Sequence, residues 1–150
     1  MGQSLIKNYL HIIFSTKHRQ NLIYPPYENK LHAYLGGTCK SLECPVLAVG
    51  GHTDHIHILC NLSKNIALKV LLQKVKASSS RWMKTKHPEF KNFYWQDGYA
   101  AFSVNPKGVE TVVRYIKTQH EHHRKQTFQK EHRSFLEKHN IEYDERYVWD

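Results

Sequence analysis

Two neighbouring segments, residues 44–52 and 55–62, constrain the fold of this chain more than any other feature. They read "CPVLAVGGH" and "HIHILCNL", two short and largely apolar runs of the length typical of β-strands. Two glycines stand near the end of the first run, and only Thr53 and Asp54 separate it from the second, which suits a tight hairpin. The chain is therefore expected to contain an antiparallel sheet built around this hairpin.

The segments around the hairpin continue an alternation of strands and helices. Residues 5–15 alternate their side chains between two faces, as a strand does, and residues 93–104 predict a fourth strand. Residues 27–42 and 65–86 are expected to be helical, the second with Ser63 as its cap. The order is that of the ferredoxin-like βαββαβ arrangement, an α+β fold whose antiparallel four-stranded sheet carries two helices on one face.

Two further helices are expected after the fourth strand. Pro106 suits the first turn of a helix over 106–128 with Asn105 as its cap, and residues 129–140 predict a shorter C-terminal helix. No repeat, low-complexity segment or Gly/Ser/Pro-rich linker divides the chain, so residues 1–150 are expected to form a single domain. The sheet face away from the first two helices is expected to be open and to carry the working site.

The composition favours a globular protein of the cytoplasm. The chain has 150 residues, of which 40% are hydrophobic, enough to bury a core. No apolar run of about 18 residues is present, and the N-terminal segment does not resemble a signal peptide, so neither a membrane span nor secretion is expected. Cys39, Cys44 and Cys60 have no C-x-x-C spacing, which predicts buried free thiols in a reducing compartment.

The net charge points to a polyanion as the partner. The sequence contains 22 Lys and Arg against 13 Asp and Glu, a net charge of +9 with histidine counted as neutral, and nucleic acid is the commonest polyanion. Basic side chains gather in the loop "TKHRQ" and along the helix predicted over 65–86, although a charged helix face is also an ordinary solvated surface. The expected contacts to DNA phosphates are Lys17, His18, Arg19, Lys74 and Arg81.

His55 and His57 stand one residue apart inside the hairpin. In a strand both side chains point to the same face of the sheet. They could be ordinary surface histidines, or they could be two ligands of a metal ion that takes its remaining ligands from elsewhere in the chain.

The helix predicted over 106–128 offers a reactive group and a further ligand. Tyr115 and Gln119, four residues apart, lie together on a flank beside the apolar stripe of this helix. A core tyrosine would more naturally lie within the stripe, so the pair is either half-buried packing or functional. A solvated, partly charged surface is expected from the nearby histidines His120, His122 and His123.

These motifs resemble those of a known family. The segment "DHIHIL", followed at a distance by "YIKTQ" with Tyr115 and Gln119, resembles the HUH endonucleases, in which two histidines flank a hydrophobic residue. More narrowly, the chain is similar to the single-tyrosine transposases of bacterial insertion sequences and their REP-associated relatives. The segments "HIIFSTKHR" and "WQDGYAAFSV" belong to the same resemblance, which covers nearly the whole chain.

The resemblance implies a DNA transposase that acts on single-stranded DNA with imperfect hairpins. It implies that Tyr115 is the nucleophile, which cleaves and rejoins phosphodiesters through a 5′-phosphotyrosine intermediate. His55, His57 and Gln119 would be the ligands of one divalent ion, Mg²⁺ or Mn²⁺. The resemblance also implies a homodimer. The protein is expected to be cytoplasmic, without membrane attachment, and associated with the nucleoid when bound to DNA.

Two alternatives remain open from sequence alone. The chain could be a non-catalytic ferredoxin-like module that binds single-stranded nucleic acid, although it lacks the aromatic-rich signature of RNA-binding sheets. It could also be a domesticated relative that processes genomic repeats without moving itself. Hydrolases with three alternating histidines do not fit, because Thr53 stands where they need the third histidine.

Overall fold

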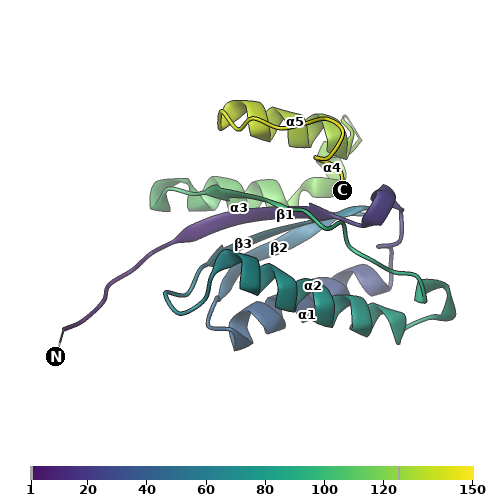
Figure 1. Cartoon of the computed structure of the whole chain (residues 1–150), viewed down its shortest axis with the longest axis horizontal. Coiled ribbons are helices and arrows are strands. Elements are labelled where there is room, and N and C mark those ends of the chain that lie inside the picture. Colours follow the sequence, from purple (N-terminus) through teal and green to yellow (C-terminus); the bar gives the residue numbers. More distant parts are fainter. Residues whose placement is uncertain (1, 125) are drawn as a thin grey trace.

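The computed structural model describes residues 2–124 and 126–150, and within them it contains one four-stranded sheet (Figure 1). Each pair of neighbouring strands is antiparallel. The spatial order is β2-β3-β1-β4, and the strands are β1 (Tyr9–Ser15), β2 (Val46–His52), β3 (His55–Asn61) and β4 (Ala100–Ser103). The predicted ferredoxin-like α+β fold with extra C-terminal helices is confirmed.

Two long helices cover one face of the sheet, α1 (Tyr27–Ser41) after β1 and α2 (Leu68–Lys84) after β3 (Figure 1). Because strand residues alternate between faces, one set of apolar side chains meets these helices in the main core, which includes Ile12, Phe14, Ile56, Ile58, Leu35 and Leu71. The residues between them on β1 and β3 therefore face the opposite side.

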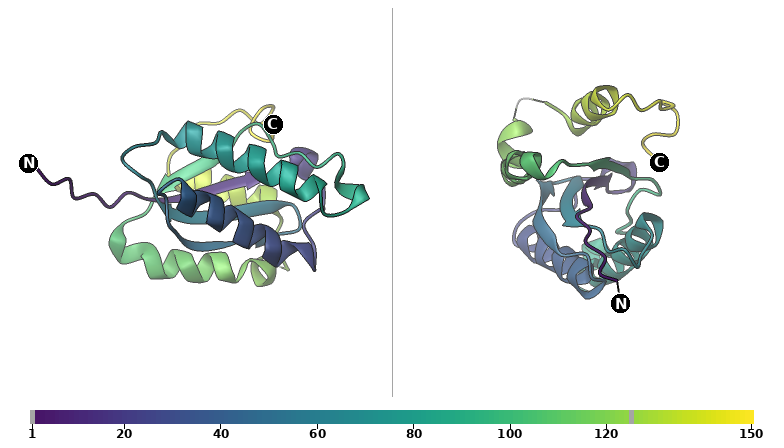
Figure 2. Two further views of the ribbon diagram at one scale, coloured as in Figure 1. Left: turned by 90° about the horizontal axis from the view of Figure 1, so that it is seen from below. Right: turned by 90° about the vertical axis from the view of Figure 1, so that its left-hand side faces the viewer.

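The opposite face is covered as well. It carries α3 (Val109–Lys117) and α5 (Phe128–Lys138), which lie across the sheet from α1 and α2 (Figure 2). Ile13 of β1 packs in a cluster with Phe128, Phe135 and Leu136 of α5, and Leu59 of β3 packs with Ile116 of α3. The expectation that this face would be open is wrong, because its strands also carry large apolar side chains whose burial is favourable.

The helix predicted over 106–128 is interrupted. It begins as a short 3₁₀ turn, η3 (Pro106–Gly108), with the Asn105 side chain accepting from the Lys107 amide, so the predicted start is confirmed. At Thr118 the backbone leaves helical geometry (φ −106°, ψ 24°), and α4 (Gln119–His122) follows. The Thr118 hydroxyl donates to the Arg114 carbonyl at 2.9 Å, a side-chain bond of the kind that bends helices. Tyr115 and Gln119 thus belong to two successive helices.

Other boundaries differ by a few residues. β1 begins four residues later than predicted, and β4 is short because Trp95 pairs with Thr16 only as an isolated bridge. Ser63 does not cap α2, since its hydroxyl accepts from the Asn65 amide in the preceding turn. The remaining 3₁₀ turns are η1 (Lys17–Arg19) and η2 (Pro88–Phe90). Among the described residues, no helix combines the length and the apolar character needed to cross a membrane.

Candidate active site

His55 and His57 of β3 lie on the sheet face that α3 and α5 cover, and both are fully buried. Their rings are 5.1 Å apart, as expected for alternate residues of one strand. The Nδ1 atom of each imidazole has a hydrogen-bond partner. His55 Nδ1 donates to Asp54 Oδ1 at 2.8 Å, and His57 Nδ1 lies 2.7 Å from His11 Nε2. Such partners fix ring orientation, so the two Nε2 atoms are aimed into the interior.

Glu131 of α5 completes this group, and sequence reasoning missed it. Its Oε1 atom lies 3.0 Å from His57 Nε2 and 3.7 Å from His55 Nε2. One ligand atom from each of the three residues lies within 4.8 Å of the others, an arrangement that can hold a metal ion. A signal was present, because Glu131 falls on the buried face of α5 with Phe128 and Leu136, where a carboxylate is rarely found unless it is paired.

Tyr115 and Gln119 reach the same place from α3 and α4. The Tyr115 hydroxyl donates to Glu131 Oε2, and Gln119 Oε1 lies 3.1 Å from His55 Nε2. Gln119 is buried, whereas Tyr115 is half-buried. The structure therefore brings together all four residues of the predicted tyrosine and metal site within one chain.

The donor set fits a cation. In the neutral tautomer that donates from Nδ1 to Asp54, the Nε2 atom of His55 carries a lone pair, and Gln119 Oε1 lies 3.1 Å from it. A positive ion placed near both atoms could be bound by the imidazole nitrogen and the amide oxygen together. Imidazole nitrogen, amide oxygen and the carboxylate of Glu131 are all common ligands of divalent ions.

The charge states of the cluster agree with this fit. Burial lowers the pKa of His57 to about 4, against the opposing effect of the Glu131 carboxylate, so the imidazole is neutral. Burial alone would raise the pKa of Glu131, but hydrogen bonds from His123, His57 and Tyr115 hold it well below its usual range. Burial and the Glu131 charge raise the pKa of Tyr115, so the phenol keeps its proton.

Of the histidines after Gln119, His120 is exposed as expected, whereas His122 and His123 are half-buried. His123 Nε2 lies 3.1 Å from Gln119 Oε1 and 3.4 Å from Glu131 Oε2, so it belongs to the cluster. His120 pairs with Glu28 of α1 at 2.6 Å, and the half-buried His122 lies 3.1 Å from the Thr118 hydroxyl. The break at Thr118 redirects these side chains, and it could not be predicted from helical spacing.

The basic residues predicted to bind DNA fall into two separate groups. Lys17 and His18 are exposed on η1. They lie close to the β2–β3 turn, because the amide of the preceding residue, Thr16, donates to the Asp54 carbonyl in that turn. Arg19 lies over the Trp149 ring, 5.6 Å from its centre. Lys74 and Arg81 lie on α2, on the far side of the sheet from the histidines. They line a groove of about 320 Å³ between α1 and α2.

The sequence match and the fold place the chain in a transposase family. The chain belongs to the family described as "Transposase IS200 like", whose model matches residues 4–119. This span contains the sheet, α1 to α3 and Gln119. Glu131 and the rest of α5 lie outside it.

Individual relatives support the same assignment. The ISDra2 transposase TnpA of Deinococcus radiodurans is 22% identical over 116 residues, which are 74% of this chain and 83% of that protein. A solved structure from the same organism, described as a transposase, has a TM-score of 0.61 at 19% identity and covers 79% of this chain and 96% of its own. A REP-associated tyrosine transposase bound to a REP hairpin has a TM-score of 0.60 at 15% identity, covering 82% and 73%. These two structures establish the likeness of fold.

Proposed function

We propose that this transposase cleaves and rejoins single-stranded DNA with Tyr115 as its nucleophile. The observation that carries the proposal is the convergence of the Tyr115 hydroxyl with His55, His57 and Gln119 in one cluster, although they come from three different elements. A tyrosine that attacks a phosphodiester becomes covalently linked to the DNA, and the energy of the broken bond is kept for rejoining.

The proton that Tyr115 loses during cleavage needs an acceptor, and we assign this role to Glu131. Attack forms a bond between the Tyr115 oxygen and phosphorus and breaks the bond to the 3′ oxygen, which leaves as a hydroxyl after gaining a proton. Tyr115 must lose its own proton during this step, and its hydrogen bond to Glu131 Oε2 offers an acceptor already in place. Since burial raises the pKa of this phenol, Tyr115 is a weak nucleophile without such help.

A divalent ion fits the same cluster, and we propose Mg²⁺ or Mn²⁺. The residues that would hold it are His55, His57 and Gln119, with Glu131 as an addition to the predicted set. When bound, the ion supplies positive charge for the phosphate oxygens. His11 and Asp54 keep the two imidazoles oriented for this role.

The DNA reaches the tyrosine from the side of α5. A cavity of about 170 Å³ is lined by Tyr115, Glu131, Ser134 and Lys138, so Lys138 offers a positive charge to a phosphate that approaches the hydroxyl. The hairpin bound by the REP-associated structural relative supports hairpin-bearing DNA as the substrate. We further propose that the protein acts as a homodimer in the cytoplasm, at the nucleoid, which light scattering and fluorescence microscopy test.

The basic residues are assigned to phosphates on both sides of the molecule. Lys17, His18 and Arg19 would hold the strand near the β2–β3 turn, and Lys74 and Arg81 would hold the stem of the hairpin along α2. Each neutralised phosphate adds about one unit to the slope of log affinity against log salt, so alanine variants should flatten that slope.

The test is the formation of a covalent adduct. Wild-type protein incubated with labelled hairpin-bearing single-stranded DNA and Mn²⁺ should give a protein–DNA species that survives denaturation, and Tyr115→Phe should bind the DNA but give none. An undiminished adduct with Tyr115→Phe removes the tyrosine from its role. Tight binding without any adduct from the wild type would favour the non-catalytic binding module.

A further inference from the structure

We propose that Tyr94 is a stacking platform for one unpaired base of the DNA, at the point where the strand passes between the two groups of basic residues. The inference rests on the proposed function and deepens it, because the basic residues of η1 and α2 are assigned to the DNA backbone alone. A base held between them would fix the length of single strand that joins the hairpin stem to the cleaved position.

Tyr94 exposes an aromatic ring between two buried ones. Its exposed fraction is 52%, whereas its neighbours in the chain, Phe93 and Trp95, are buried in the main core. Of the three apolar clusters that the described residues form, none includes Tyr94. A partner that covers this ring therefore removes apolar surface from water, which favours binding.

Lys84 of α2 occupies one face of this ring. Its ammonium nitrogen lies 4.1 Å from the ring centre, and it donates to the Ser80 hydroxyl and to the Phe93 carbonyl, both at 2.7 Å. These bonds hold the positive charge in place. With Lys84 over one face, the exposure of half the side chain leaves the other face open to a base. An aromatic platform beside a fixed cation is the arrangement by which proteins bind single strands without reading their sequence.

Tyr94 also links the two basic groups. Its carbonyl accepts from the Lys17 amide at 2.8 Å, so it lies directly beside η1. On α2, Lys84 and Arg81 are three residues apart and are therefore neighbours on the helix surface. Figure 1 shows η1 and the C-terminal end of α2 at the same end of the molecule. Basic side chains thus continue from η1 across Tyr94 to the groove between α1 and α2.

The backbone of η1 has an unusual conformation beside the platform. His18 and Arg19 have φ values of 58° and 54°, in the left-handed region that residues other than glycine rarely adopt. Such conformations persist where the surroundings fix them, and they cluster at ligand sites. The hydrogen bond from the Lys17 amide to Tyr94 ties this turn to the platform, so the exposed Lys17 and His18 are presented next to the ring.

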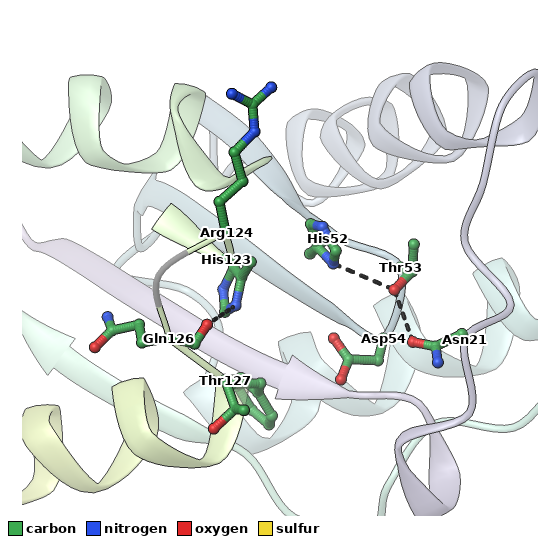
Figure 3. Close-up of a pocket in the computed structure, with 9 residues that line it drawn as sticks. Asn21, His52, Thr53, Asp54, His123, Arg124, Gln126 and Thr127 are labelled. Atoms are coloured by element: carbon green, nitrogen blue, oxygen red, sulfur yellow. Dashed lines mark hydrogen bonds between the residues drawn. The ribbon is translucent and has the colours of Figure 1, made fainter. Parts of the chain in front are cut away.

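An open cavity continues from η1 towards the buried cluster (Figure 3). Its volume is about 650 Å³, and the β2–β3 turn, residues 52–54, forms one side of it. Asn21, two residues after η1, lines the cavity and accepts from the Thr53 hydroxyl at 2.7 Å (Figure 3). Asp54 of the same turn contacts His55 of the cluster at 2.8 Å. A strand that leaves Tyr94 along η1 therefore has an open path to the cluster.

The platform should depend on the presence of a base and not on its identity. Every base has a flat π-face, so stacking on a single ring tolerates all four bases. The inference consequently predicts that one position of the unpaired strand must carry a base, whichever base it is. Removal of that base should have the same effect on binding as removal of the Tyr94 ring.

The first test measures binding without cleavage. Hairpin-bearing DNA is prepared with a single abasic site at each position of the unpaired strand in turn, and Kd is measured by fluorescence anisotropy in EDTA. For the wild type, the abasic site at one position should weaken binding about tenfold. Tyr94→Ala should bind the intact DNA about tenfold more weakly, and the same abasic site should cost it nothing further. Equal losses in the two proteins at every position overturn the inference.

Further variants separate stacking from other effects of the side chain. Tyr94→Phe keeps the ring and should bind as the wild type does, whereas Tyr94→Leu is apolar without a ring and should bind as weakly as Tyr94→Ala. Tyr147→Ala is the matched control, because Tyr147 is 64% exposed and has Arg146 over its ring at 5.3 Å, but it lies outside the path from η1 to α2. It should bind as the wild type does. Tight binding by Tyr94→Leu, or an equal loss in Tyr147→Ala, counts against the platform.

The last test separates the platform from the chemistry. At saturating DNA, Tyr94→Ala should form the covalent adduct at the wild-type rate, and at limiting DNA its rate should fall about tenfold, because Tyr94 acts in binding alone. Coupling between Tyr94 and the abasic site, without any adduct from the wild type, would overturn the proposed cleavage and keep the platform. Wild-type affinity of Tyr94→Ala with normal adduct formation would overturn the platform and keep the cleavage. No binding of the DNA by the wild type would overturn both.

Discussion

Replacing Gly50 with alanine tests the position of the helix that carries the tyrosine. A Cβ atom added at Gly50 would lie 2.4 Å from the Ile116 carbonyl oxygen and 2.9 Å from Ile116 Cγ2, so α3 rests directly on β2 at this point. An ordinary contact is about 3.5 Å, and the helix must therefore move away by about 1 Å. Overpacking of this kind costs about 1–3 kcal/mol of stability.

Two quantities should change in this variant. In a chain of this length each kcal/mol lowers Tm by about 2–4 °C. Because Tyr115 directly precedes Ile116, the displacement also moves the hydroxyl relative to His57, and a misplacement of about 1 Å can slow a reaction roughly 100-fold. Thermal unfolding followed by circular dichroism measures the first effect, and the rate of adduct formation in a single turnover measures the second.

A second glycine provides the control. Gly37 lies inside α1, where an added Cβ would meet nothing within 4 Å. Gly37→Ala should therefore raise stability by about 0.5–1 kcal/mol and leave the adduct rate unchanged. If Gly50→Ala unfolds at the wild-type temperature and reacts at the wild-type rate, the contact of α3 with β2 does not fix the position of Tyr115.

Three further predictions follow from the buried groups. Mn²⁺ at about 100 times its Kd should stabilise the protein by about 2.7 kcal/mol, and Glu131→Gln should weaken Mn²⁺ binding at least about tenfold in calorimetry; equal affinity would remove Glu131 from the ligand set. Burial lowers the pKa of His11 to about 2, so the unfolded chain takes up a proton at this residue below about pH 6.5 while the folded chain does not. In EDTA, stability should consequently fall as pH falls from 6.5 to 4.5, by about 2.3 kcal/mol for this histidine, and His11→Asn should show a flatter dependence; parallel curves would refute this. Lys76 donates to three carbonyls of residues 96–98, at 2.9, 3.2 and 2.6 Å, so Lys76→Met should leave these oxygens unpaired and lower stability by about 2–4 kcal/mol in urea unfolding, whereas an unchanged midpoint would show that water replaces the lysine.

The parts of the site that follow local periodicity could be predicted from the sequence. The two-residue spacing of His55 and His57 fixes their common face once β3 is a strand, and the four-residue spacing of Tyr115 and Gln119 survives the break between α3 and α4. The order of strands and helices along the chain was sufficient for the topology of the sheet.

The contribution of α5 could not be predicted in this way. Glu131 reaches His57 because Phe128 and Leu136 pack on Ile13 and its neighbours in the sheet, a contact between segments more than 100 residues apart. No local pattern specifies such a contact. The same packing closes the sheet face that was expected to be open, since the apolar residues on the inner side of α5 could equally have met a partner or another part of the chain.

The central claim is that Tyr115 becomes covalently joined to DNA, and the linkage can be located directly. The denaturation-resistant adduct is digested with trypsin and nuclease, and the modified peptide is sequenced by mass spectrometry. The account predicts a nucleotide attached through phosphate to Tyr115, in the peptide Tyr115–Lys117. A nucleotide found on any other side chain, or an adduct from which Tyr115 is recovered unmodified, would contradict it.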